Sequence, residues 1–369
     1  MNTEKRAEPV AGRSLIVQQT RDFEMLKSKT VRVLSIVSLS LAMIVRSEEQ
    51  PTCTQITGYK VCEKKGTLVD VSQQEFEERL EIHDLNLLAI RENAFKNLTT
   101  TKLSLGLGNR ISVVGRESFR GLERLERLDL DSNVVPLSPN LFSELKQLHS
   151  LSLIFNKIDT IPKDSFAGLT NLMWLYLGHN DIESIGKDSF SGLSPSLTFL
   201  WLNDNKITSI EAGTFSQMPE LTRLHLENNR LTSIQPGVLR GLHKLDGLFL
   251  EENQLTSVSR NDFKGLIDLR ILNLQHNQIA SIEPGAFSDL RQLEQLDLRK
   301  NRLSHVNSDV FNRLFSLKKL DLSSNDIATT ESGAFAGLPA LKSLNLANNK
   351  LTNVDRKDLG LTSLTILYT

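Results

Sequence analysis

The stretch LRILNLQHNQIASIEPGAFSDL, residues 269–290, carries the pattern that decides the fold. Leu269, Leu272 and Leu274 are spaced as the inward-facing residues of a half-buried strand, and Asn277 follows where the chain must turn. The same run recurs around ten asparagines, every 23 to 25 residues. A turn of this length cannot bury its own apolar face, so neighbouring turns must stack, and the sequence predicts a solenoid. The asparagines are Asn133, Asn156, Asn180, Asn205, Asn229, Asn253, Asn277, Asn301, Asn325 and Asn349.

Two ladders of identical residue types are predicted to be structural. The asparagine amides can satisfy backbone groups of adjacent turns in the interior. About ten residues after each asparagine comes a large apolar residue, which we interpret as core on the convex side rather than as a cofactor pocket. This second ladder contains Phe119, Phe142, Phe166, Phe190, Phe215, Leu239, Phe263, Phe287, Phe311 and Phe335.

The unit L-x-x-L-x-L-x-x-N-x-I-x-x-I-x-x-x-x-F-x-x-L resembles the typical 24-residue leucine-rich repeat of extracellular animal proteins such as Slit, Toll-like receptor ectodomains and the acid-labile subunit. The resemblance covers about residues 76–369. It implies an α/β repeat solenoid: a horseshoe with a parallel concave sheet and an irregular or short-helical convex side. The segment YKVCEKKGTLVDV, from Tyr59, resembles part of that family's N-terminal cap, although the family usually has four cysteines there and this chain has two.

Charge and cysteine content narrow the class of protein. The net charge of -1, with both signs mixed along 369 residues, gives no basic stripe for nucleic acid. Only Cys53 and Cys62 occur, directly before the repeats, and they form either a disulfide in an oxidising compartment or two buried thiols in the cytosol. The segment upstream looks secretory, which favours the disulfide.

The domain organisation follows from these segments. Basic residues, the apolar stretch Val33 to Val45 and small residues near Ser47 are typical of a signal peptide, with a short uncleaved anchor as the alternative. We therefore expect a leader over 1–47, an N-terminal cap over 48–75 and a repeat array over 76–369 with an incomplete last repeat. The C-terminal cap usual in the family is missing, so we expect a truncated fragment, an incomplete gene model or an end that a partner covers. No membrane span is expected beyond the N-terminal segment.

The best candidate binding surface lies on the predicted concave face. Aromatic residues occupy outward positions on successive strands, and strands lie about 4.8 Å apart, so these side chains should form one patch with a charged rim. The alternatives are a homodimer surface or simple packing between strands. The residues are Trp174, Tyr176, Phe199, Trp201, Arg223, His225, Glu227, Phe249 and Glu251.

The remaining motifs complete the functional hypothesis. Asn97 begins an N-glycosylation sequon away from the concave strands. No catalytic, metal-binding or cofactor motif is found, so we expect neither an enzyme nor a metal site. We predict a secreted or cell-surface protein that binds an extracellular protein ligand. The alternatives are a self-associating matrix or adhesion component and a truncated receptor ectodomain.

Overall fold

The computed structural model describes residues 50–352, 361 and 364–369. The predicted leader, residues 1–47, lies outside the described residues, and Thr52–Thr369 forms one compact unit. Two larger sheets and three small ones make up this unit.

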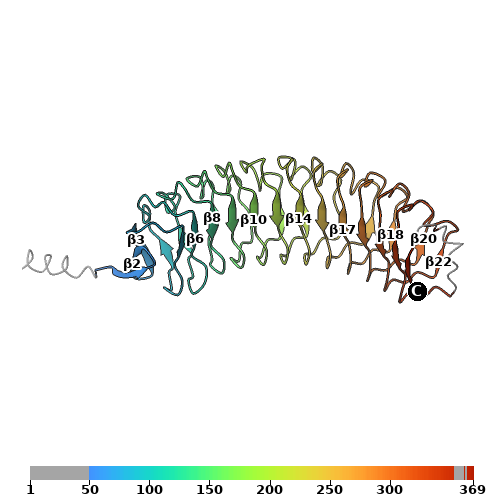
Figure 1. Ribbon diagram of the computed structural model, residues 1–369, viewed down its shortest axis with the longest axis horizontal. Coiled ribbons are helices and arrows are strands. Elements are labelled where there is room, and N and C mark those ends of the chain that lie inside the picture. Colours follow the sequence, from blue (N-terminus) through green and yellow to red (C-terminus); the bar gives the residue numbers. More distant parts are fainter. Residues whose placement is uncertain (1–49, 353–360, 362–363) are drawn as a thin grey trace, which may run out of the picture. The chain divides into compact units, whose positions relative to one another are not determined.

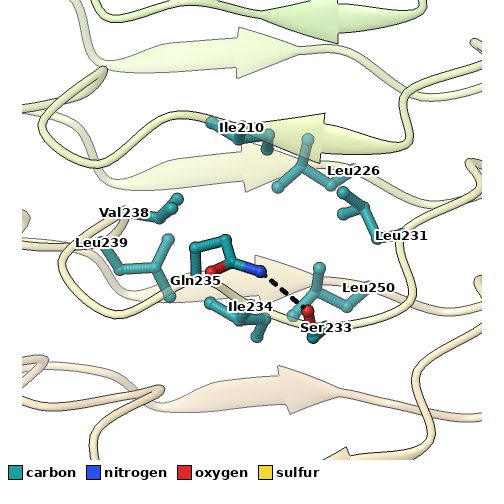
Figure 2. A pocket seen from close by; sticks show the side chains of 9 residues that line it. All are labelled: Ile210, Leu226, Leu231, Ser233, Ile234, Gln235, Val238, Leu239 and Leu250. Atoms are coloured by element: carbon teal, nitrogen blue, oxygen red, sulfur yellow. Dashed lines mark hydrogen bonds between the residues drawn. The ribbon is translucent and has the colours of Figure 1, made fainter.

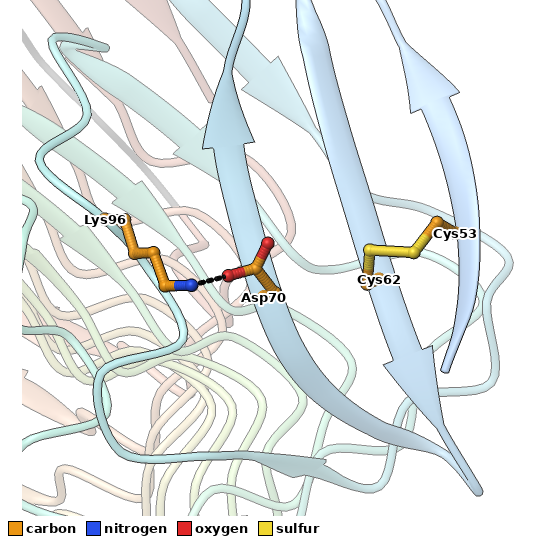
Figure 3. Close-up of a disulfide and its surroundings, with 4 residues drawn as sticks. All are labelled: Cys53, Cys62, Asp70 and Lys96. Carbon is orange, nitrogen blue, oxygen red and sulfur yellow. Dashed lines mark ion pairs between the residues drawn. A yellow bond between two sulfur atoms is a disulfide. The ribbon is translucent and has the colours of Figure 1, made fainter. Parts of the chain in front are cut away.

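A five-stranded sheet forms the N-terminal cap. Its first two strands are antiparallel and place Cys53 directly opposite Cys62, and a disulfide joins the two (Figure 3). Lys96, beyond the cap, forms an ion pair with Asp70 of the third strand. The fourth strand pairs in parallel with the third and the fifth pairs in parallel with the fourth, so the cap sheet continues into the first repeats. In sheet order the strands are β1 (Thr52–Ile56), β2 (Tyr59–Lys64), β3 (Thr67–Gln73), β5 (Ala89–Ile90) and β7 (Val113–Val114).

A 13-stranded parallel sheet runs through the array, with one strand per repeat. Figure 1 shows these strands stacked in chain order from β6 to β17. The middle residue of each strand points into the core, whereas the first and third face outward. The strands are β4 (Arg79–Glu81), β6 (Lys102–Ser104), β8 (Arg127–Asp129), β9 (Ser150–Ser152), β10 (Trp174–Tyr176), β12 (Phe199–Trp201), β14 (Arg223–His225), β15 (Gly247–Phe249), β17 (Ile271–Asn273), β19 (Gln295–Asp297), β21 (Lys319–Asp321), β23 (Ser343–Asn345) and β24 (Ile366–Tyr368).

The opposite side of the array contains turns, so of the two predicted forms the irregular one is observed and the short-helical one is not, within the described residues. In one repeat, Ala286 N–H donates to Glu283 C=O and Ser288 N–H donates to Gly285 C=O, which are separate i to i−3 turns. Gly285 has a φ of 75°, which interrupts a right-handed helix between the two turns. Three two-stranded sheets lie between these turns and the asparagines: β11 (Ser184–Ile185) with β13 (Ser209–Ile210), β16 (Ser257–Val258) with β18 (Ser281–Ile282), and β20 (His305–Val306) with β22 (Thr329–Thr330).

The asparagine ladder links each repeat to the one before it. Asn229 is 6% exposed, and its Oδ1 accepts the N–H of Ile207 at 3.0 Å. Its Nδ2 donates to the carbonyls of Leu202 and Leu226, at 2.9 and 3.0 Å. Its neighbours in the asparagine ladder repeat this pattern. The buried backbone groups of the turn are therefore paired, although the turn has no regular pairing between strands.

The phenylalanine ladder fills the other side of the core. The ring centroids of Phe287 and Phe311 lie 6.3 Å apart and the two ring planes are nearly parallel. Other successive rings of the ladder stack similarly. Leu239 interrupts the ladder between Phe215 and Phe263 and lines an apolar cavity of about 20 Å³, roughly the room one water needs. Figure 2 shows the leucine and isoleucine side chains around this cavity. A smaller side chain at one rung therefore leaves the core incompletely filled.

Candidate functional site

The outward side of the 13-stranded sheet, here called the open face, carries three rows of side chains. Row 1 consists of the first residue of each strand and row 2 of the third residue. Row 3 consists of the second residue beyond each strand, such as Glu227 after β14. Because the strands pair in register, every residue of a row lies directly beside the equivalent residue of the next repeat.

Row 2 contains a continuous stack of rings over β10, β12, β14 and β15. The ring centroids of Tyr176 and Trp201 lie 4.2 Å apart, those of Trp201 and His225 lie 5.4 Å apart, and those of His225 and Phe249 lie 4.3 Å apart. Successive rings are inclined by 10° to 14°. The four residues, here called the aromatic stack, thus form one ribbon across four repeats, as the sequence led us to expect.

Row 1 adds two more rings beside the stack. Phe199 lies with its ring centroid 5.5 Å from that of Trp201 and 6.3 Å from that of Trp174. All six aromatic residues are half-buried. The rings therefore pack on one another across strands, and each also keeps part of its surface open to solvent, so packing between strands and ligand contact are compatible.

Arg223 is the one predicted site residue that turns to a partner outside the patch. Its guanidinium pairs with Asp246, which comes directly before β15. The strand neighbour of Arg223 is Gly247, and a Cβ atom there would come within 2.9 Å of the Arg223 Cδ. Gly247 therefore leaves the space in which the arginine lies across the sheet. Neither Asp246 nor Gly247 was predicted to have a role, although a glycine at an outward strand position is a signal of close approach.

Two carboxyl groups lie at the row 3 edge of the stack. Glu227 Oε1 lies 2.9 Å from His225 Nδ1, and among the described residues the buried Oε2 atoms of Glu227 and Glu251 have no hydrogen-bond partner. Burial raises the pKa of Glu251 to about 7, and the charge of Glu227 adds to this rise, although a backbone hydrogen bond opposes it. The Glu251 carboxyl group therefore gains and loses its proton near neutral pH.

Phe155 and His179 form a ring pair that the sequence analysis missed. They precede the ladder asparagines of two neighbouring repeats, their ring centroids lie 4.4 Å apart, and Phe155 is 55% exposed. Phe155 has a φ of 57°, a left-handed conformation that suits polar residues better than a bulky ring. An apolar residue at this otherwise polar position of the repeat was the available sequence signal.

The other predicted sites lie away from the open face. Asn97 is exposed in a turn after Phe95, with a φ of 50°. Among residues 50–352 and the described C-terminal residues, no group of three or more His, Cys, Asp and Glu side chains could hold a metal ion. The same part of the chain contains no helix with the length and apolar character to span a membrane.

Comparisons with known proteins find repeats of one kind along the array. The leucine rich repeat family matches in overlapping segments from residues 100–158 to 315–368. Mimecan of Gallus gallus is 28% identical over 226 residues, which is 54% of this chain and 71% of mimecan.

Solved structures agree with the fold. In a TLR13–ssRNA13 complex, TLR13 aligns with a TM-score of 0.73 and 29% identity over 79% of this chain, but this chain spans only 43% of that one. An octameric complex of Latrophilin 3, Unc5D and FLRT2 leucine-rich repeats gives a TM-score of 0.51 at 26% identity, over 62% of this chain and 76% of that one. An internalin of Listeria monocytogenes shares the fold, with a TM-score of 0.57 at 21% identity. The alignment covers 81% of this chain and 89% of the internalin.

Proposed function

The chain belongs to the leucine-rich repeat family, and from this premise we propose that it is an extracellular module that binds a protein ligand on its open face. The observation that carries the proposal is the aromatic stack. Half-buried rings on four consecutive strands offer a large apolar area with few freely rotating bonds, which is typical of the residues that dominate protein interfaces. A sheet held in register by the core leaves little of the protein to be ordered on binding.

Two further observations support an extracellular protein ligand. The Cys53–Cys62 disulfide is of a kind that persists in oxidising compartments. The FLRT2 leucine-rich repeats were solved together with the proteins Latrophilin 3 and Unc5D. TLR13 was solved with an RNA, but the open face of this chain combines basic residues in row 1 with carboxylates in rows 2 and 3, so it offers a phosphate backbone no uniformly basic surface. A protein is therefore the favoured class of ligand.

The test compares two aromatic variants in a binding screen. The full chain, Trp201→Ser and Phe315→Ala are measured against a panel of purified extracellular domains, with a single-stranded RNA included. Phe315 is 54% exposed and lies outside the open face, so it is the matched control. We expect at least one protein to bind the unmodified chain and the control equally, and to bind Trp201→Ser at least ten times more weakly.

Several outcomes would count against the proposal. Equal binding by Trp201→Ser would remove the aromatic stack from the interface, and binding of the RNA alone would change the class of ligand. Sedimentation of the unmodified chain measures its oligomeric state and so tests the self-association alternative. A dimer that Trp201→Ser dissociates would assign the stack to a second copy of the chain, as in an adhesion or matrix component.

A further inference from the structure

The open face is electrically divided along its length. Row 1 carries five cationic residues and no carboxylate: Arg79, Lys102, Arg127, Arg223 and Lys319. Row 2 carries four carboxylates and no lysine or arginine: Glu81, Asp129, Asp297 and Asp321. Row 3 adds Asp131, Glu227 and Glu251 against a single arginine, Arg299. The rows at the two edges of the same sheet face therefore carry side chains of opposite sign, although the chain as a whole is nearly neutral. Three of the row 1 cations also pair with carboxylates: Arg79 with Glu81, Lys102 with Glu78 and Arg223 with Asp246.

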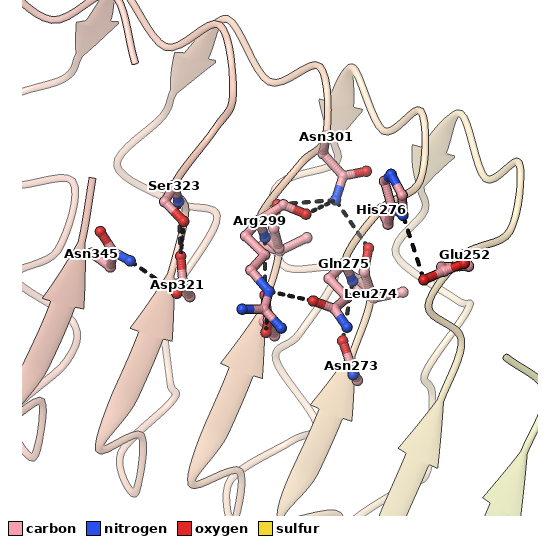
Figure 4. A network of polar contacts seen from close by, with 12 residues as sticks. Glu252, Asn273, Leu274, Gln275, His276, Arg299, Asn301, Asp321, Ser323 and Asn345 are labelled. Carbon is pink, nitrogen blue, oxygen red and sulfur yellow. Dashed lines mark hydrogen bonds and ion pairs between the residues drawn. The ribbon is translucent and has the colours of Figure 1, made fainter. Parts of the chain in front are cut away.

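Beyond the aromatic stack, row 2 changes from rings to oxygens. Phe249 pairs with Asn273, and Asp297, Asp321 and Asn345 follow on the next three strands. These four oxygen-bearing side chains line a hollow of about 270 Å³ on the open face. Figure 4 shows Asn273, Asp321 and Asn345 on their separate strands, with Asn345 reaching toward Asp321.

The carboxylates in this hollow are only partly compensated. Arg299 Nε lies 3.2 Å from Asp297 and also contacts Gln275, which holds it toward row 3. Asp321 accepts hydrogen bonds from Asn345 and Ser323, but has no cationic partner among the described residues. Lys319 also lines the hollow, but it stands in row 1, two residues and about 7 Å along the same strand from Asp321. A cation that enters at row 2 is thus nearer to two carboxylates than to the lysine.

We propose that the open face takes a protein segment lying along the solenoid, with an apolar side chain on the aromatic stack and a basic side chain in the hollow at Asp297 and Asp321. This inference rests on the proposed function and specifies the ligand of the same surface. The charge division sets which side of the segment faces which row, because basic groups of the ligand must lie toward rows 2 and 3.

The strand spacing gives the offset between the two groups. Asp297 and Asp321 lie two and three strands beyond Phe249, which is about 10 to 14 Å at a spacing of about 4.8 Å. An extended chain advances about 3.3 Å per residue. The basic residue is therefore expected about three or four positions from the apolar residue.

The experiment is a selection of random 12-residue peptides displayed on phage against the immobilised full chain, followed by fluorescence polarisation with the selected peptides. The double variant Asp297→Asn/Asp321→Asn removes the two charges, and Asp297→Lys/Asp321→Lys reverses them. The control is Asp268→Asn, because Asp268 is an exposed carboxylate outside the open face. Circular dichroism melting checks that each variant is folded.

The expected results are specific to charge. Peptides selected on the unmodified chain should carry Lys or Arg three or four residues from an aromatic or aliphatic residue. They should bind the neutral double variant at least five times more weakly and the control within twofold. The reversed variant should select Asp or Glu at the same offset.

The opposite results separate the two proposals. Peptides without a basic residue at that offset, or binding of the neutral double variant within twofold, would overturn the inference and leave the proposed function standing if Trp201→Ser still abolishes binding. Full binding by Trp201→Ser would overturn the proposed function. A selection with no enrichment over an uncoated surface would overturn both.

Discussion

Replacing Asn229 by alanine should destabilise the array through one particular backbone group. Its Oδ1 is the acceptor for the buried N–H of Ile207, for which the described residues offer no other. The three carbonyls to which Asn229 donates are less affected, because each has a second donor: Leu202 O accepts from Asn205, Leu226 O from Asn253 and Glu227 O from the N–H of Asp204. The substitution therefore orphans one donor fully and three acceptors only in part.

The magnitude follows from these contacts. A buried donor left without a partner costs about 1–3 kcal/mol, and each partly compensated carbonyl adds a fraction of the roughly 1 kcal/mol of an ordinary hydrogen bond. We expect Asn229→Ala to lower the free energy of unfolding by about 2–4 kcal/mol. Asn349, which makes equivalent bonds but is only half-buried, should lose less on the same substitution.

Guanidinium denaturation followed by circular dichroism measures the effect, with Arg230→Ala as the control. Arg230 is exposed beside the ladder and should change the free energy of unfolding by less than about 0.5 kcal/mol. If Asn229→Ala fell within the same range as Arg230→Ala, the asparagine ladder would not be needed to satisfy the buried turn, and the reasoning would be refuted.

Four further outcomes are expected. Leu239→Phe should fill the gap in the ring ladder and raise the free energy of unfolding by about 1 kcal/mol, and a lower melting temperature would show that the cavity cannot accept a ring. The pKa of Glu251 is raised to about 7 from 4.5, so its protonated form stabilises the fold. Denaturation of the unmodified chain at a series of pH values should therefore show the free energy of unfolding fall by roughly 1–2 kcal/mol between pH 4.5 and 7, with solvent screening taken into account. Glu251→Gln should remove this fall, and its absence from the unmodified chain would contradict the prediction. Replacing Cys53 and Cys62 by serine should cost the cap about 2–3 kcal/mol and speed hydrogen exchange in β1 and β2, while unchanged exchange would mean that the pairing of β1 and β2 alone holds the cap. Mass spectrometry of the chain secreted from animal cells should find a glycan on Asn97, and its absence from secreted protein would contradict the sequon prediction.

The aromatic stack was predictable because its positions depend only on period. In a parallel sheet with one strand per repeat, equal offsets from the ladder asparagine fall on the same row, so Trp201 and His225 had to be neighbours. The direction in which a long side chain turns does not follow from period. Arg223 could have pointed to solvent, and its turn toward Asp246 depends on the space that Gly247 leaves.

The sequence by itself determined the solenoid, the inward leucines, the two ladders and the membership of the rows, because a repeat of fixed length imposes the same environment on every equivalent residue. Only the tertiary structure decided the rest. The segments opposite the sheet form separate turns rather than helices, because residues in left-handed conformations, mostly glycines, interrupt them. Stacking of the strands also buried the Oε2 atoms of Glu227 and Glu251 without a hydrogen-bond partner among the described residues, and it placed the Arg223 guanidinium against Asp246. Burial and charge at these positions come from neighbours about 24 residues away in the sequence, so no local pattern could reveal them.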